Sequence, residues 1–295
     1  MTLSVVVVLH DSAPELVRLL ESIDRHLADR PEVVAVDTGS RDDGADLAAE
    51  WGARVVALPD GTGFGAANDE GIAHVSGDVA ALLNPDVRVL DDGLERLAAL
   101  ARERDALFVP RLLNADGSVQ RSAHPPPGGG SAFLPALVHP RLLPSAKRLA
   151  AEPWRDEQPR TVGWAIAAAL VARTALLREL GPFATRAHLF FEDMDLCLRA
   201  AERGAPTELR PEVRLLHSGG HSTEPAFGGE PHEVIARRRR EVVAERLGSQ
   251  ALARDDAAQA LTFTTRVVAR AATGRGTRRP AAQLRALRAA RREAR

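Results

Sequence analysis

The stretch SVVVVLHDSAPELVRLLESIDRHL, residues 4–27, determines how the rest of the chain is interpreted. Residues 5–9 are a short, continuously apolar and mostly β-branched run, which is typical of a strand buried on both faces. Asp11 or Ser12 can cap a following helix, and Pro14 would lie in its first turn. Apolar residues then recur at helical spacing, at positions 16, 19, 20, 23 and 27. The stretch therefore predicts a buried strand followed by an amphipathic helix.

The same strand–helix pattern repeats to about residue 110. Further strands are predicted at EVVAVD (32–37), ARVVALP (53–59), DVAALLNPD (78–86) and ALFVP (106–110), with helices at 42–51, 63–75 and 91–104. Alternation of this kind predicts an α/β fold with a mainly parallel sheet and helices on both of its faces.

The second half of the chain is less regular. Asp116-Gly117 predicts a hairpin turn, and SAHPPPGGGSAF (122–133) predicts a loop. Apolar order returns at TVGWAIAAALVA (161–172), followed by a helix at 173–180 and a strand VRLLH at 213–217. After residue 229 the pattern predicts basic helices to the end of the chain, interrupted around Gly274, Gly276 and Pro280.

Charge and cysteine content exclude several classes of protein. The single cysteine, Cys197, allows no disulfide within the chain and no Cys-rich zinc site, which favours a reducing, cytosolic setting. We predict no signal peptide and no membrane span, because the longest apolar runs are too short. Residues 237–295 contain 16 arginines and 5 acidic residues, so a basic tail follows an acidic body.

Polar residues follow several of the predicted strands. Asp37 ends one strand, and Asn84 and Asp86 follow another. Ligands of open α/β sheets bind at such strand ends, where one carboxylate can accept hydrogen bonds from a nucleoside and another can hold a divalent cation. Each carboxylate could instead be a simple turn or cap residue.

A dinucleotide-binding pattern is the competing interpretation of this half. Gly61-x-Gly63-x-x-Ala66 precedes a predicted helix, and Asp86 lies about 20 residues further on, as the fingerprint requires. However, Pro59-Asp60 separates the glycines from the strand, where the fingerprint needs a tight turn. An NAD-dependent oxidoreductase is therefore the weaker alternative.

Three carboxylates lie beside apolar surface in LFFEDMDLCLRAAERG, residues 189–204. Placing Glu192, Asp193 and Asp195 there is costly unless their charge or basicity is used. Asp195 is expected to pair with Arg199 one helical turn later, in a structural role. Cys197 is expected to pack in the core.

Seven motifs occur in an order that resembles a known family: VVVVLHDS, VDTGSRDDG, GFGAANDEG, LLNPDV, a Gly-Trp segment, FFEDMDLCLRAAERG and LLHSGGHS. They resemble the bacterial family 2 inverting glycosyltransferases of the GT-A fold, especially the rhamnosyltransferase-like branch. The resemblance runs from Leu3 to about Ser222. It implies a GT-A domain over residues 1–229, with a nucleotide-sugar-binding half (1–110) and an acceptor or catalytic half (111–229), followed by a basic helical extension (230–295).

The resemblance also implies a donor site. Its residues would be Asp37, Ser40, Gly65, Asn68, Asn84 and Asp86. Asp86 and His217 would hold a divalent metal, Mg²⁺ or Mn²⁺, against the diphosphate of a nucleoside diphosphate sugar. The chain departs from the family pattern at Thr38 and at Asn84, which replaces the first carboxylate of the usual D-x-D-like element. His217 could instead be a loop residue without a ligand.

On the acceptor side the resemblance implies that Asp193 is the catalytic base. Glu192 would orient Asp193 or bind the acceptor, and Trp164 would form an acceptor platform or pack in the core. The implied reaction is inverting, metal-dependent transfer of a sugar, with dTDP-rhamnose favoured as donor, to a hydroxyl of a glycan or polyprenyl-linked acceptor in cell-envelope polysaccharide synthesis.

The basic tail has three interpretations. Its amphipathic arginine-rich helices suit an anionic membrane surface, which would make a cytoplasmic enzyme peripheral to the membrane. A solvated extension is the next interpretation. Few aromatic residues accompany the arginines, so we expect no nucleic-acid partner. A non-catalytic binder of anionic surfaces, built on a degenerate transferase domain, is the alternative from a different functional class. The sequence does not indicate an oligomeric state.

Overall fold

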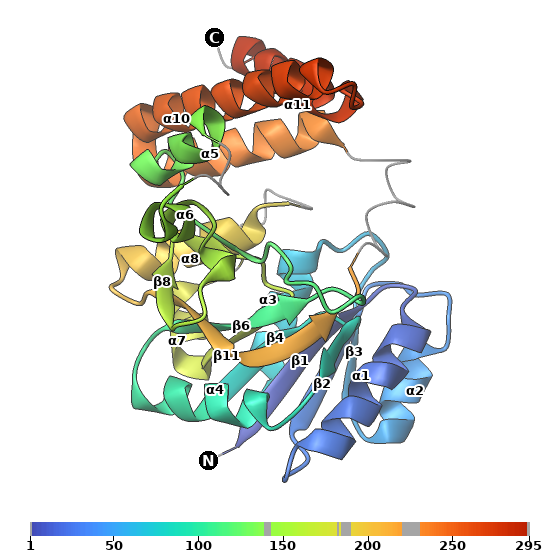
Figure 1. Ribbon diagram of the computed structural model, residues 1–295. Coiled ribbons are helices and arrows are strands. Elements are labelled where there is room, and N and C mark those ends of the chain that lie inside the picture. Colours follow the sequence, from blue (N-terminus) through green and yellow to red (C-terminus); the bar gives the residue numbers. More distant parts are fainter. Residues whose placement is uncertain (1, 139–142, 182, 184–189, 220–230, 294–295) are drawn as a thin grey trace. The chain divides into compact units, whose positions relative to one another are not determined.

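The computed structural model describes residues 2–138, 143–181, 183, 190–219 and 231–293 (Figure 1). The chain forms two compact units. Unit 1 contains Met1–Ala123 and Asp156–Gly220, and unit 2 contains His124–Arg155 and His221–Arg295. The segment 124–155 thus belongs to the same unit as the C-terminal helices. The boundary expected at residues 229–230 lies outside the described residues.

Unit 1 is built on a nine-stranded sheet. Its strands are β1 (Leu3–Leu9), β2 (Glu32–Asp37), β3 (Arg54–Ala57), β4 (Val79–Leu83), β5 (Val87–Val89), β6 (Leu107–Leu113), β8 (Arg160–Val162), β10 (Ala169–Arg173) and β11 (Thr207–His217). The strand order is β3-β2-β1-β4-β10-β6-β11-β5, and β8 pairs with β11. A separate two-stranded sheet pairs β7 (Ala123–His124) with β9 (Trp164–Ala165).

Helices cover both faces of this sheet, as the sequence pattern predicts. They are α1 (Ala13–His26), α2 (Gly44–Trp51), α3 (Phe64–His74), α4 (Gly93–Glu103), α7 (Thr174–Leu180) and α8 (Glu192–Glu202). Because side chains alternate along a strand, Val5 and Val7 join the core cluster formed with α1 and α4, whereas Val6 faces α3. A Cβ on Gly71 of α3 would lie 2.3 Å from the Cγ1 atom of Val6, so this glycine lets α3 lie close against β1.

The sheet is parallel from β3 to β4 and mixed beyond it. β10 runs antiparallel between β4 and β6, while β6 and β11 are parallel to each other. The apolar stretch 161–172 therefore contributes to three short strands, with turns between them. The hairpin predicted at Asp116-Gly117 is confirmed, because Leu113 bridges Val119 in antiparallel fashion and Gly117 has a φ of 78°.

Unit 2 is helical. Its elements are the 3₁₀ helices η1 (Gly130–Phe133) and η3 (Pro153–Arg155) and the α-helices α5 (Leu134–Leu137), α6 (Ser145–Ala151), α10 (His232–Ala272) and α11 (Arg278–Glu293). The expected loop at 122–133 is thus partly helical, and the Gly128 N–H donates to the carboxylate of Asp255 in α10. The interruption predicted around Gly274 and Gly276 is confirmed between α10 and α11.

A reversal inside α10 was not predicted. Gly248 has non-helical φ and ψ angles of 79° and 176°, and the guanidinium of Arg239 donates to Asp255 at 2.8 Å. Arg239 and Asp255 would be about 24 Å apart along a straight helix. The chain therefore turns back at Gly248, and the two halves of α10 lie side by side (Figure 1). In the part of the chain that the structure describes, none of the helices combines the length and apolarity needed to cross a bilayer.

Candidate active site

Three strand ends bring polar residues to one edge of the sheet. In the parallel pairing, Leu9 of β1 lies opposite Asp37 of β2, and Val7 lies opposite Leu83 of β4. The residues that follow β1 and β4 must therefore emerge at the same edge as Asp37. Asp37, Asn84 and Asp86 consequently share one end of unit 1, as the sequence predicted.

Asp86 and His217 lie next to each other in this region. The antiparallel register sets His217 of β11 opposite Val87 of β5, so His217 lies beside the residue before β5. His217 Nε2 is 3.3 Å from Asp86 Oδ1, and the Gly219 N–H donates to Asp86 Oδ2 at 2.7 Å. Burial works against ionisation of Asp86, but the hydrogen bond and charge of His217, together with the Gly219 N–H, hold its pKa below the usual value.

Gln120 orients the His217 ring. His217 Nδ1 lies 2.8 Å from Gln120 Oε1, an acceptor, so Nδ1 carries the proton in this hydrogen bond. In the neutral imidazole, Nε2 then presents a lone pair toward Asp86. A proton or a metal ion between Nε2 and the Asp86 carboxylate would make this 3.3 Å approach attractive.

Asn84 offers a third possible metal ligand beside Asp86 and His217. Its amide nitrogen is 3.5 Å from His217 Nε2, and its Oδ1 atom is buried with no hydrogen-bond partner among the described residues. A buried polar atom without a partner is costly, which is the pattern expected where a ligand is missing. Oxygen and imidazole donors fit Mg²⁺ or Mn²⁺. The described residues contain no group of three or more His, Cys, Asp or Glu that could hold a metal ion, so substrate oxygens would have to complete the coordination.

Asp193 lies at the second position of α8 with its side chain partly exposed. Its Oδ1 atom accepts from the Met194 N–H at 2.7 Å, and the Ala167 N–H also bonds to the carboxylate. Burial outweighs these donors and raises the pKa of Asp193 to about 6. A carboxylate with this pKa accepts a proton more readily than an ordinary aspartate and is still ionised at neutral pH.

Two consecutive residues connect Asp193 to the Asp86–His217 pair. Ala167 donates to Asp193, and the carbonyl of Ala168 accepts from the Asn84 N–H at 2.9 Å. Adjacent Cα atoms are about 3.8 Å apart, so Asp193 and Asn84, which lies two residues before Asp86, bond to neighbouring residues of one short peptide segment.

The segment entering α8 is strained. Phe190 and Phe191 have φ angles of 77° and 66°, a left-handed conformation that is unfavourable for bulky residues. Phe191 packs against Trp164, with ring centroids 5.9 Å apart and planes at 64°. Trp164 is only 7% exposed, so most of its ring is in the core and little of it could form an acceptor platform.

A buried ion pair fixes the other side of α8. Asp195 Oδ2 accepts from Arg199 Nε at 2.8 Å, which confirms the predicted i,i+4 pair, and Arg199 also donates to the Leu180 carbonyl. Asp69, which sequence reasoning missed, accepts from the Phe183 N–H at 2.8 Å. Burial raises the pKa of Asp69 to about 6, against the lowering effects of that hydrogen bond and of Arg199. Cys197 is buried, as expected.

The remaining residues predicted for the nucleotide-sugar site form hydrogen bonds mainly with the local backbone. Asp37 accepts from the Ser40 N–H at 3.1 Å, and Ser40 Oγ accepts from the Asp11 N–H at 3.2 Å. Asn68 is buried, and its amide donates to the Phe64 carbonyl within α3. The structure therefore keeps Asp37 and Ser40 together at the sheet edge, while Asn68 lies on a buried face of its helix.

Gly65 and Glu192 are both packed against other groups. A Cβ on Gly65 would lie 2.7 Å from the Cβ of Phe183, so this position has no room for a side chain. Glu192 is 5% exposed, next to Asp193. Among the residues that sequence reasoning missed, Asp69 follows Asn68 directly in its motif and could have been found. Gln120 could not, because its partner is 97 residues away in the sequence.

Comparison with known proteins shows which family and which fold the chain resembles. Residues 4–145 match the model of glycosyl transferase family 2. N-acetylglucosaminyl-diphospho-decaprenol L-rhamnosyltransferase of Mycobacterium tuberculosis is 29% identical over 244 residues, which are 75% of this chain and 77% of that protein. Undecaprenyl-phosphate 4-deoxy-4-formamido-L-arabinose transferase of Pseudomonas savastanoi pv. phaseolicola is 40% identical over 98 residues, 31% of this chain and 29% of that protein.

Solved structures share the fold at low sequence identity. The mannosyltransferase PcManGT from Pyrobaculum calidifontis, in complex with GDP-Man and Mn²⁺, has a TM-score of 0.60 at 16% identity and covers 98% of this chain and 85% of its own. TarS 1-349 of S. aureus, in complex with UDP-GlcNAc, has a TM-score of 0.57 at 16% identity, with coverage of 90% and 71%. The predicted α/β architecture is thereby confirmed as that of GT-A glycosyltransferases. Residues 4–145 thus match glycosyl transferase family 2, and this match together with the similar rhamnosyltransferase identifies the chain as a glycosyltransferase.

Proposed function

We propose that this glycosyltransferase moves a sugar, with inversion, from a nucleoside diphosphate donor to a hydroxyl group of a glycan or lipid-linked acceptor in cell-envelope polysaccharide synthesis. The observation that carries the proposal is the short connection between the Asp86–His217 pair and Asp193, through Ala167 and Ala168. A cation and diphosphate site and a proton acceptor, linked through neighbouring residues of one peptide segment, are the two groups that such a displacement requires.

On the donor side, Asp86, His217 and the Oδ1 atom of Asn84 would hold a divalent cation, Mg²⁺ or Mn²⁺. When bound, the cation supplies neutralisation of the charge that develops on the departing diphosphate. Gln120 keeps His217 Nε2 available by fixing the proton on Nδ1, and the Gly219 N–H keeps Asp86 ionised. Asp37 and Ser40 at the same sheet edge would contact the nucleoside.

On the acceptor side, Asp193 would take the proton of the attacking hydroxyl. Inversion requires that hydroxyl to approach the sugar from the face opposite the leaving diphosphate, so Asp193 would act at that face of the bound sugar. General base catalysis of this kind contributes roughly 10²–10⁴-fold to the rate. Glu192, buried beside Asp193, would act by orienting it, and Trp164 would support the acceptor side mainly by packing against Phe191.

The donor we favour is a dTDP-rhamnose-like sugar. The support is the relative of 29% identity, whose name specifies an L-rhamnosyltransferase acting on an N-acetylglucosaminyl-diphospho-decaprenol. A polyprenyl-diphosphate-linked sugar is accordingly the acceptor class that we propose. The solved neighbours were obtained with UDP-GlcNAc and GDP-Man, so uridine and guanosine diphosphate donors belong in the same test.

A thermal-shift screen tests the donor proposal. The protein would be heated with dTDP, UDP, GDP or NAD, each with and without Mn²⁺. We expect a nucleoside diphosphate to raise the unfolding temperature only when metal is present. In Asp86→Ala we expect this metal-dependent rise in unfolding temperature to be lost. Stabilisation by NAD alone, or by none of these compounds, would contradict the proposal.

We further propose that the enzyme works at the cytoplasmic face of a membrane, bound peripherally through the basic helices of unit 2. Deleting these helices is a poor test, because Gly128 in the segment 124–155 bonds to Asp255 of α10 and would lose its partner. Co-sedimentation of the whole chain with phosphatidylglycerol vesicles and with neutral vesicles is cleaner. Binding should be specific for the anionic vesicles and should fall as salt rises. Equal binding to both kinds of vesicle would refute the proposal.

A further inference from the structure

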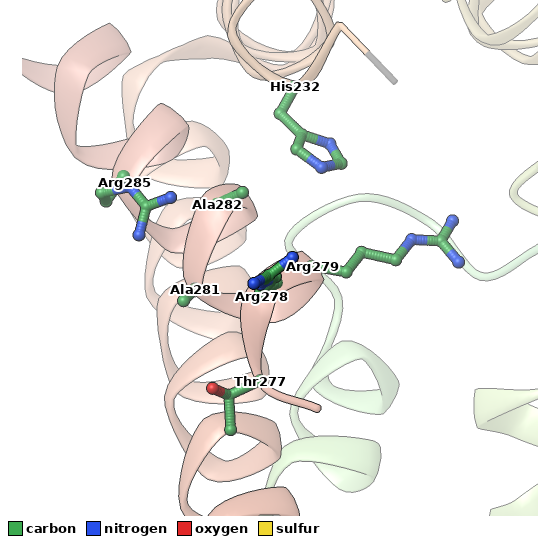
Figure 2. Close-up of a pocket in the computed structure, with 7 residues that line it drawn as sticks. All are labelled: His232, Thr277, Arg278, Arg279, Ala281, Ala282 and Arg285. Atoms are coloured by element: carbon green, nitrogen blue, oxygen red, sulfur yellow. The ribbon is translucent and has the colours of Figure 1, made fainter. Parts of the chain in front are cut away.

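Unit 2 contains a basic pocket that the transferase reaction does not use. It has a volume of about 600 Å³ and is lined by His232, Thr277, Arg278, Arg279, Ala281, Ala282 and Arg285. Figure 2 shows His232, from the first turn of α10, facing the first turns of α11, which carry the three arginines. We call this cavity the α11 pocket. A volume in this range is typical of small-molecule sites.

The charge of the α11 pocket is not balanced from within. None of the described residues that line it is acidic, and neither Arg278 nor Arg285 has a salt bridge to a carboxylate among the described residues. Arg278 and Arg285 carry like charges on the same pocket, and a bound anion would reduce the repulsion between them.

Two buried acidic residues of unit 2, Asp255 and Asp256, are paired with arginines outside the pocket. Asp255 binds Arg239 at 2.8 Å, and Asp256 binds Arg240 and lies 3.6 Å from Arg291. Asp255 and Asp256 are buried between the helices, so they are fixed in these pairs and are not available to the α11 pocket. These two carboxylates thus neutralise arginines that hold the helices together, whereas Arg278 and Arg285 of the pocket are exposed to solvent.

We propose that the α11 pocket binds a phosphate or diphosphate group, carried either by a lipid or by a soluble molecule. Guanidinium groups bind phosphate oxygens through paired, charge-assisted hydrogen bonds, and Arg278 and Arg285, which are about two turns apart on α11, both line the pocket. Thr277 adds a hydroxyl group, and Ala281 and Ala282 give the pocket an apolar side. The proposal is independent of the transferase mechanism, because all seven lining residues belong to unit 2.

The test compares two double variants that each remove two positive charges. Arg278→Ala/Arg285→Ala changes the α11 pocket, and Arg254→Ala/Arg292→Ala changes exposed arginines that do not line it. Sodium pyrophosphate is titrated into each full-length protein by calorimetry in the presence of EDTA. The donor site is identical in both variants, so the difference between them reports the α11 pocket. Thermal unfolding of each variant checks that its fold is intact.

We expect the pocket variant to bind pyrophosphate at least tenfold more weakly than the wild type, and the control variant to bind it equally well. A second arm measures flotation with phosphatidylcholine vesicles that contain phosphatidic acid. Loss of flotation in the pocket variant alone identifies a lipid phosphate as the source, whereas equal flotation of both variants identifies a soluble one. If the two variants bind pyrophosphate with the same affinity, the proposal is wrong whatever the vesicles show.

Discussion

Asp86 and Asp193 have pKa values shifted in opposite directions within one site. Asp86 faces His217 and a backbone N–H, which together overcome the effect of burial and keep its pKa low. Asp193 receives only backbone N–H groups, so burial dominates and its pKa rises to about 6. Pairs of carboxyl groups separated in this way commonly divide the roles of charge and proton transfer. The residues themselves thus suggest a charge-stabilising role for Asp86 and a proton-accepting role for Asp193.

The raised pKa predicts the pH dependence of the reaction. A carboxyl group with a pKa near 6 is protonated, and useless as a base, at lower pH. We therefore expect kcat/KM to be constant above pH 7 and to fall by about tenfold per pH unit well below pH 6. A pH–rate profile whose acidic limb has its midpoint near pH 4, the usual value for aspartate, would contradict the role of Asp193.

Gln120 should act on the metal through His217. Gln120→Ala removes the acceptor that fixes the Nδ1 proton, so the imidazole loses its preferred tautomer and orientation. We expect the Mn²⁺ concentration needed for half-maximal activity to rise by roughly 10–100-fold. Gln158→Ala, at an exposed position, is the control and should leave the metal requirement unchanged. An unchanged requirement in Gln120→Ala would remove the residue from this role.

At the scale of single elements, α3 is positioned by two close approaches. Gly71 brings the helix onto β1, and Gly65 makes room for Phe183, whose N–H donates to Asp69. The sequence predicted the helix from its pattern but not the reason for its glycines, because their neighbours come from other parts of the chain. A glycine inside a helix costs about 1 kcal/mol relative to alanine, so tertiary packing must supply the compensation.

Replacing the glycine of this contact should destabilise unit 1. In Gly71→Ala the new methyl group would lie 2.3 Å from Val6 Cγ1, which forces β1 and α3 apart. We expect the free energy of unfolding in urea to fall by about 1–3 kcal/mol, despite the better helix propensity of alanine. Gly276→Ala adds a methyl group in open space and should be close to neutral. Equal stability of the two variants would show that α3 does not depend on this contact.

For the whole molecule, the sequence predicted the parallel half of the sheet and the order of the polar motifs. Those features are local, because each strand, cap and turn signal is contained within a few residues. It did not predict the antiparallel insertion of β10, since short apolar runs do not specify their neighbours in a sheet. Nor did it predict the membership of 124–155 in the C-terminal unit or the reversal at Gly248, which depend on long-range pairs such as Arg239–Asp255.

The candidate site likewise contains residues that the sequence could predict and residues that it could not. Asp86, His217 and Asp193 could be chosen from motifs, and the register of β5 with β11 and the Ala167–Ala168 link then bring them together. The supporting groups, Gln120 and the backbone of Ala167, could not be chosen, because any polar residue or N–H in the right place would serve. The sequence therefore predicts best those site residues whose chemical role requires one particular residue type.

The most direct test of the account is the effect of Asp193→Asn on donor binding and on turnover, measured with the same protein preparation. We expect the binding constant for the donor nucleoside diphosphate with Mn²⁺, determined by calorimetry, to stay at its wild-type value, while the rate of sugar transfer falls by at least roughly 100-fold. If the variant transfers sugar at a rate within a few-fold of the wild type, Asp193 is not the base and the proposed mechanism is wrong.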